Sequence, residues 1–192
     1  MSTRRASTGN APLLAWGEAM RLVRHRRRTR RLIIGMTMGI AALGLPVLCS
    51  PAPRLLWNAS ASAPIGLYRV IPGTAARAGD MVVARAPEPW RALAAGRRYI
   101  PVNVPLVKHV AAAGGQEVCA QGRTIFIDRK RVAMRQPTDP HGRTLPWWDG
   151  CVRLHGGQLF LLTDAPDSFD GRYFGITEDE DVIGRAVLLW RR

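Results

Sequence analysis

Two features of this chain could supply a nucleophile and its base: a loop serine and an unusually rare lysine. The chain has 26 arginines but only two lysines, Lys108 and Lys130. An arginine guanidinium stays protonated in proteins, whereas a desolvated lysine can become neutral and accept a proton. Lys108 lies in the mainly apolar run 102–110, and Ser62 lies in the small-residue segment 58–68. A loop serine with a lysine in an apolar run is the pair that a Ser–Lys hydrolase requires.

Each residue alone also fits a simpler role. Pro64 and Gly66 predict a turn that holds the side chain of Ser62 away from a sheet, as for many loop serines. A strand lysine usually extends to solvent. For Lys108 to act as a base near neutral pH, its pKa must fall by roughly 3 units, which costs about 4 kcal/mol. Burial among the neighbouring apolar residues could supply this shift.

The N-terminal part of the chain combines strong positive charge with an apolar run. Residues 1–50 carry nine arginines and one glutamate, and residues 32–49 contain no charged side chain. A helix of 18 residues is roughly 27 Å long, enough for the core of a bilayer. We therefore predict a cytoplasmic Arg-rich tail over 1–31, a transmembrane signal-anchor helix over 32–50 and an extracytoplasmic domain over 51–192. A buried helix of a soluble domain and a cleaved secretory signal are the alternatives.

The net charge of +14 could also indicate a nucleic-acid-binding protein. Because the densest arginine run adjoins the apolar segment, we expect the lipid bilayer, and no nucleic acid, as its partner. No Cys/His spacing predicts a metal site, and we expect no cofactor. Cys49 lies in the predicted anchor. Cys119 and Cys151 could form a disulfide in an oxidising compartment or remain two buried free thiols.

After the anchor the sequence alternates short apolar runs with Gly, Pro and Asp, which predicts a mainly β domain, a sandwich or barrel, on a single N-terminal transmembrane helix. One short helix is expected near 89–95. A hairpin tip is expected at 128–131, where Lys130 would be an exposed turn residue. The predicted strands cover 66–70, 80–85, 106–110, 124–128, 158–163 and 182–190.

Four sequence blocks, in order, resemble the type I signal peptidases (family S26) and, within them, the conjugative-transfer peptidase TraF group. The first block of that group reads Asn-x-Ser/Thr-x-Ser-x-Pro-x-Gly-Leu-Tyr. The resemblance implies that Ser62 is the nucleophile and that the hydroxyl of Ser60 stabilises the oxyanion. The matching residues are Asn58, Ser60, Ser62, Pro64, Gly66, Leu67 and Tyr68.

The remaining blocks carry a structural strand, the base and its support. Residues 79–83 resemble the Gly-Asp-apolar strand of the family, and 107–115 resemble the base block, with Lys108 as general base and His109 in place of an arginine. Residues 168–175 resemble Ser-x-Asp-Ser-Arg-Tyr-Trp-Gly. By this resemblance Ser168 orients the lysine, Asp170 and Arg172 form an ion pair, and Gly171 replaces a serine.

The resemblance implies a signal-peptidase-like β domain and acyl transfer without metal or cofactor. The expected substrate is a membrane-tethered, exported precursor cut after a small residue, as for a pilin of a conjugation or type IV secretion apparatus, with hydrolysis or cyclisation as the last step. The expected location is the cytoplasmic membrane, with the catalytic domain on the periplasmic side. A general type I leader peptidase is the alternative. A membrane-anchored protein that binds DNA or acts as a scaffold is a remote alternative.

Overall fold

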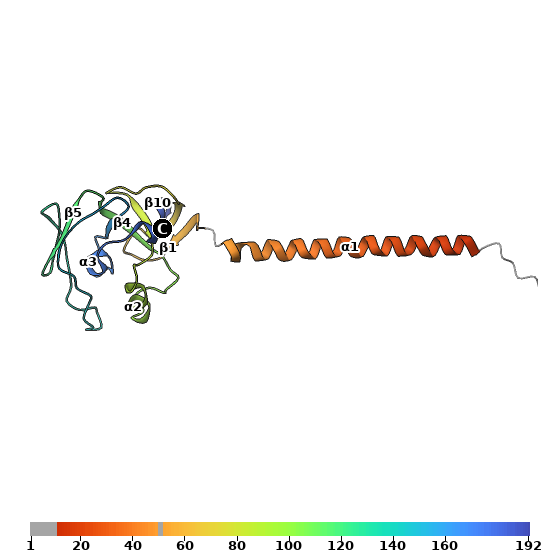
Figure 1. Ribbon diagram of the computed structural model, residues 1–192. Helices are drawn as coiled ribbons and strands as arrows, with labels where there is room; N and C mark the ends of the chain where they lie inside the picture. Colours follow the sequence, from red (N-terminus) through yellow and green to blue (C-terminus); the bar gives the residue numbers. More distant parts are fainter. Residues whose placement is uncertain (1–10, 50–51) are drawn as a thin grey trace, which may run out of the picture. The chain divides into compact units, whose positions relative to one another are not determined.

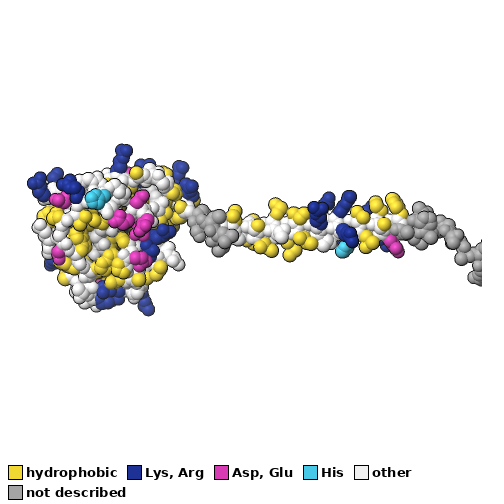
Figure 2. Space-filling model, viewed as in Figure 1, with side chains coloured by type: hydrophobic (Ala, Val, Ile, Leu, Met, Phe, Trp, Pro, Cys, Tyr) yellow, Lys and Arg dark blue, Asp and Glu magenta, His cyan; other side chains and the backbone are white. Residues whose placement is uncertain are grey.

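A computed structural model describes residues 11–49 and 52–192, which fall into two compact units that divide after residue 51. The first unit contains one long helix, α1 (Ala11–Cys49), which begins inside the segment predicted as an Arg-rich tail (Figure 1). Arginine side chains gather on one stretch of α1, with apolar side chains on either side (Figure 2). Residues 1–10 and 50 of the predicted tail and anchor lie outside the described residues.

The membrane-spanning segment predicted over 32–50 is helical where it is described, since α1 continues to Cys49. Over residues 11–49 and 52–192, however, no helix combines the length and the apolarity that crossing a membrane requires. The anchor is therefore not confirmed.

The second unit is mainly β, as predicted, and consists of two antiparallel sheets. A six-stranded sheet has the order β1-β2-β10-β3-β4-β9, and a four-stranded sheet has the order β7-β6-β5-β8. The strands of the first sheet are β1 (Leu55–Asn58), β2 (Gly66–Ile71), β3 (Met81–Ala84), β4 (Leu106–Ala113), β9 (Leu159–Leu162) and β10 (Val182–Arg191). Those of the second are β5 (Glu117–Gln121), β6 (Thr124–Ile127), β7 (Lys130–Met134) and β8 (Gly150–Arg153).

Two of the buried apolar clusters in this unit help to explain why the sheets form where they do. One lies under the six-stranded sheet around Tyr68, Val70 and Val83. The other joins the two sheets, because β4 and β9 share it with β5 and β6 through residues such as Val118, Ile125 and Phe160. Burial alternates along β2 and β6, the period-2 pattern of a half-buried strand, whereas β9 is buried along its whole length.

All six predicted strands are present, and the predicted short helix is α2 (Trp90–Gly96). The hairpin is present too, but Lys130 begins β7 instead of lying in the turn. The turn consists of Asp128 and Arg129, whose positive φ angles of 47° and 66° suit a two-residue hairpin loop. The sequence patterns did not predict β1, β5, β8 or the helices α3 (Gly171–Phe174) and η1 (Asp179–Asp181).

Cys119 and Cys151 are directly opposite each other on β5 and β8, and they form a disulfide. The structure therefore contains the cross-link, and the alternative of two free thiols is wrong.

Candidate active site

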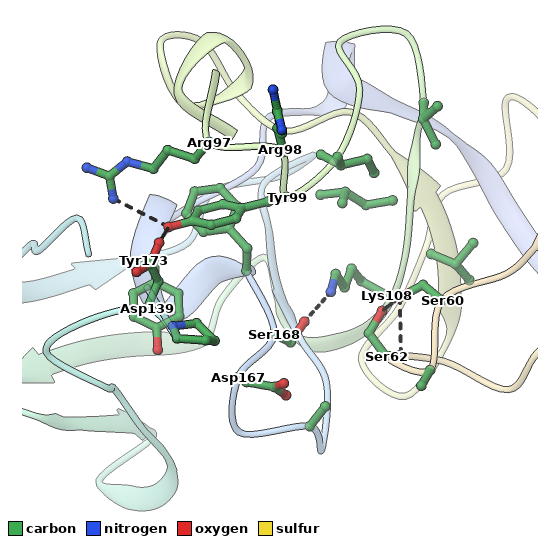
Figure 3. A pocket seen from close by; sticks show the side chains of 18 of the residues that line it. Ser60, Ser62, Arg97, Arg98, Tyr99, Lys108, Asp139, Asp167, Ser168 and Tyr173 are labelled. Carbon is green, nitrogen blue, oxygen red and sulfur yellow. Dashed lines mark hydrogen bonds between the residues drawn. The ribbon is translucent and has the colours of Figure 1, made fainter. Parts of the chain in front are cut away.

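A cleft of about 1320 Å³ contains the serines and the lysine identified from the sequence (Figure 3). Four separate parts of the chain line it, within 56–62, 96–108, 136–145 and 165–173. Ser60, Ser62, Lys108 and Ser168 all lie in this one cleft. The fold thus brings the predicted nucleophile, base and supporting serine together from three different loops and strands.

The two serines lie on the loop between β1 and β2, which Asn58 holds in shape. The buried side chain of Asn58 donates to the carbonyl oxygens of Ser60 and Ala63, at 2.9 and 3.1 Å, and accepts from the backbone amide of Ser60 at 3.1 Å. The hydroxyl of Tyr68 donates to the Pro64 carbonyl at 2.7 Å. The first and last residues of the Asn-to-Tyr block therefore stabilise the loop that presents its serines.

Residue 66 of the same block must be a glycine because the backbone of β10 lies very close to it. A Cβ at this position would collide with the backbone carbonyl of Trp190, because β10 lies against β2 there. Within the loop, the Oγ atoms of Ser60 and Ser62 are 3.0 Å apart, and the amide of Ser62 donates to Ser60 Oγ at 3.3 Å. The hydroxyl of Ser60 is thus next to both the hydroxyl and the backbone amide of Ser62.

Lys108 projects from β4 into the cleft, and its side chain is almost fully buried, with 2% of the residue exposed. β4 is a central strand between β3 and β9, so its backbone is held on both sides. Nζ of Lys108 donates a hydrogen bond to Ser168 Oγ at 2.5 Å.

Burial lowers the pKa of Lys108 from 10.5 to about 8. Asp170 and Asp167 act to raise the pKa of Lys108, and Arg172 acts to lower it, but burial is the dominant effect. Desolvation disfavours the ammonium form of a lysine, so a substantial fraction of Lys108 is neutral near pH 8.

Ser168 lies on the loop between β9 and α3, and a buried ion pair closes the base of that loop. Arg172 donates from Nε to Asp170 Oδ1 at 2.8 Å and from Nη2 to Oδ2 at 3.0 Å, a two-point contact. Asp170 also accepts from the Thr163 amide at 3.1 Å, and Arg172 donates to the Thr163 and Pro166 carbonyls at 2.6 and 3.2 Å. The ion pair thus joins both ends of the loop that carries Ser168.

The family model "Signal peptidase, peptidase S26" matches residues 27–191, most of the chain. The chain belongs to the S26 signal peptidase family. This membership makes the protein a serine protease, and it sets aside the alternative of a non-enzymatic DNA-binding or scaffold protein.

Relatives of this peptidase include proteins named for conjugal transfer. It is 33% identical to the conjugal transfer protein TraF of Agrobacterium fabrum over 67% of this chain and 78% of that protein. It is 29% identical to a probable conjugal transfer protein TraF of Sinorhizobium fredii over 86% of this chain and 92% of that protein. A crystal structure of a signal peptidase I from Enterococcus faecalis aligns with 58% of this chain and 97% of its own at 16% identity, with a TM-score of 0.35.

The structure explains why this peptidase has Gly171 at the position where the family block has a serine. A Cβ at residue 171 would lie 2.7 Å from the Leu161 carbonyl oxygen and 2.9 Å from the ring of Phe160. The close contact between α3 and β9 therefore requires the glycine. His109, which replaces the family arginine, is exposed on the side of β4 opposite to Lys108.

Several residues of the peptidase cleft were not identified from the sequence. Tyr99, Asp139 and Arg143 form a hydrogen-bonded group in the cleft wall, and Asp167 lies next to Ser168. Tyr99 and Asp139 are 40 positions apart in the sequence, so no local pattern indicates their contact. In the described parts of the chain, no group of three or more His, Cys, Asp or Glu side chains is arranged to hold a metal.

Proposed function

We propose that this peptidase uses a Ser62–Lys108 dyad to process an exported precursor of a conjugation apparatus, a pilin-like protein tethered to the membrane. The observation that carries the proposal is the buried Lys108, which is hydrogen-bonded to Ser168 in the same cleft as Ser60 and Ser62. A lysine with a pKa of about 8 can accept a proton from a serine hydroxyl near neutral pH.

Neutral Lys108 removes the proton from Ser62 Oγ, and Ser62 attacks the scissile carbonyl. In the described residues no direct hydrogen bond joins Lys108 Nζ to Ser62 Oγ, so the proton moves after substrate binding brings the two groups together. The lysinium then protonates the leaving amine. Water, or an amine of the substrate itself, cleaves the acyl-enzyme, which gives a linear or a cyclic product.

Ser60 and Ser168 take supporting roles in this mechanism. Ser60 Oγ, adjacent to the amide of Ser62, donates to the developing oxyanion together with that amide. Ser168 accepts one N–H of Lys108, which leaves the lone pair of the neutral amine available for Ser62. The buried ion pair of Asp170 and Arg172 positions Ser168.

The conjugal transfer names of the two relatives support a conjugation-related substrate. The Cys119–Cys151 disulfide supports an extracytoplasmic location, because such bonds persist in oxidising compartments. We accordingly infer that the peptidase unit acts outside the cytoplasmic membrane, with residues 32–50 as its anchor and 1–31 inside. Reporter fusions after Arg31 and Gly73 test this topology, and a cytoplasmic signal at Gly73 would contradict it.

Co-expression of the full chain with candidate pilin precursors tests the proposed reaction. Mass spectrometry should show a shortened precursor, and a cyclic product is lighter than the linear one by one water. The Ser62→Ala variant should leave the precursor uncut. A shortened precursor at wild-type level in cells that express Ser62→Ala would overturn the proposal.

A general type I leader peptidase is the competing function, and the family membership supports it equally. A panel of unrelated secreted precursors in the same co-expression experiment distinguishes the two. Efficient cleavage of the whole panel indicates the general enzyme, and cleavage restricted to pilin-like precursors indicates the specialised one.

A further inference from the structure

One side of the cleft is a wall built from two segments that are far apart in the sequence, 97–99 and 139–143, together called the arginine wall. Tyr99 Oη donates to Asp139 Oδ2 at 2.6 Å, and Arg143 Nη2 donates to the Arg97 carbonyl at 3.2 Å. Arg97 Nη1 in turn donates to the carbonyl of Thr144 at 2.7 Å. These contacts hold both segments in place, so the wall is formed before any substrate binds.

The carboxylate of Asp139, which belongs to the wall, accepts hydrogen bonds at both of its oxygens. It is buried and accepts from Arg143 Nε at 2.6 Å, from Tyr99 and from the backbone amides of His141 and Arg143 at 2.9 and 2.8 Å. Burial acts to raise the pKa of Asp139, but these hydrogen bonds outweigh it and hold the pKa below its ordinary value. Asp139 is therefore charged, and Arg143 balances its charge.

Arg97 and Arg98 keep their positive charges without such a balance. The acceptors of Arg97 are neutral, the Thr144 carbonyl and the Tyr99 oxygen. Arg98 is exposed, and in residues 11–49 and 52–192 neither arginine forms an ion pair. Both residues line the cleft, so this wall carries two arginines that form no ion pair among the described residues.

The charge of the cleft changes sign near the dyad. In Figure 3, Arg98 and Asp167 are drawn on opposite sides of the hydrogen bond between Lys108 and Ser168. Asp167 is exposed, lines the cleft and directly precedes Ser168, the hydrogen-bond partner of Lys108, beside which Figure 3 draws it. An anionic group of a bound peptide is therefore favoured at the arginine wall and disfavoured beside the dyad.

We propose that the arginine wall binds a carboxylate of the peptide substrate at a position remote from the scissile bond. The carboxylate is an acidic side chain or the C-terminus of the chain, since a guanidinium binds either one at two points. This inference rests on the proposed function, because it assigns the occupant of the same cleft.

Binding of labelled peptides to the full-length Ser62→Ala protein, followed by fluorescence anisotropy, tests the inference without turnover. The peptides share an Ala-x-Ala core and carry a single Glu at successive positions on either side, each compared with Gln. Each is made with a free and with an amidated C-terminus. Glu at one or more remote positions, or a free C-terminus, should bind about three- to tenfold more tightly than its neutral counterpart. Glu next to the scissile bond should bring no gain.

The arginine variants show whether the gain comes from the wall. Arg98→Gln and the double variant Arg97→Gln/Arg98→Gln should reduce it, the double variant to none. Arg131→Gln, an exposed residue of β7 outside the cleft, removes the same charge and should leave the gain intact. Arg98→Gln removes no hydrogen bond of the wall, so it separates lost charge from lost structure.

Equal binding of Glu and Gln peptides, no binding of any peptide, or a gain that survives in the double variant would each overturn the inference. A gain confined to the free C-terminus identifies a terminal carboxylate as the occupant, and a gain confined to Glu identifies a side chain. Cleavage of the same peptides by the wild-type protein is measured separately. Arginine-dependent binding without cleavage would count against the proposed function and leave the carboxylate site standing.

Discussion

Lys108 and Ser168 are sixty residues apart in the sequence, yet Lys108 Nζ donates to Ser168 Oγ at 2.5 Å inside the cleft. The lysine comes from a central strand and the serine from a loop that a buried ion pair closes. This contact directs the amine of Lys108 into the cleft that contains Ser62.

Lys108→Arg should be as inactive as Lys108→Ala. Arginine keeps the positive charge and most of the length, but it does not become neutral at working pH and so cannot accept the proton of Ser62. Cleavage of a precursor by purified variants measures the effect. Lys130→Arg is the matched control, because Lys130 is exposed on β7, and it should retain wild-type activity. Full activity of Lys108→Arg would mean that the lysine is structural.

The value of kcat/KM should rise with pH and reach half its maximum near pH 8. Only the neutral form of Lys108 is a base, and burial lowers its pKa from 10.5 to about 8. Below pH 7 the activity should fall about tenfold for each unit of pH. A profile that is flat between pH 6 and 9, or a midpoint near 10.4, would contradict a desolvated lysine base.

Lys108→Met should stabilise the folded protein at neutral pH. The pKa of Lys108 is lower in the folded than in the unfolded chain, so its charge destabilises the fold fully below pH 8, and the effect disappears as the pH rises to 10.5. A shift of this size corresponds to about 3 kcal/mol, reduced by the lost hydrogen bond to Ser168. Denaturant unfolding should show a gain of about 1–3 kcal/mol at pH 7 that shrinks toward pH 10. Lys130→Met should show no such dependence on pH.

Ser62→Ala should abolish cleavage without unfolding the domain, because it removes one hydroxyl of a partly exposed loop. Ser60→Ala should slow cleavage by roughly 10²–10³, as expected when one oxyanion donor is lost. Single-turnover rates with a precursor peptide separate the two, and circular dichroism verifies the fold. If Ser60→Ala were inactive and Ser62→Ala active, the nucleophile would be Ser60.

Arg172→Lys should lower the free energy of unfolding by about 2–4 kcal/mol, because an ammonium cannot reproduce the two-point contact to Asp170 and the bonds to two carbonyls. Activity should fall as well, because the Asp170–Arg172 ion pair no longer holds together the two ends of the loop that carries Ser168. The control is Arg91→Lys. Arg91 contacts Asp181 at 2.7 Å in a partly exposed ion pair, so its loss should cost at most about 1 kcal/mol. Similar losses in both variants would show that the buried pair has no special role.

The sequence was sufficient where the determining interactions are local. The Asn58-to-Tyr68 block predicted its serine loop, because Asn58 and Tyr68 bond to the backbone within six residues of themselves. Short apolar runs bounded by Gly, Pro and Asp located the strands that border the apolar clusters, since their side chains must be buried there. Weakly patterned strands such as β1 and β8, which are largely exposed, were not identified.

The sequence alone therefore determined the mainly β class, the position of most strands and the side chains able to carry Ser–Lys chemistry. The tertiary structure decided the rest: the contact of Lys108 with Ser168, the desolvation that lowers its pKa, the disulfide, and the wall formed by Tyr99, Asp139 and the arginines. The physical reason is the distance along the sequence over which each interaction acts. Hydrophobic period and turn preference act over a few neighbouring residues, whereas burial and pairing of charges depend on segments that meet only when the sheets close.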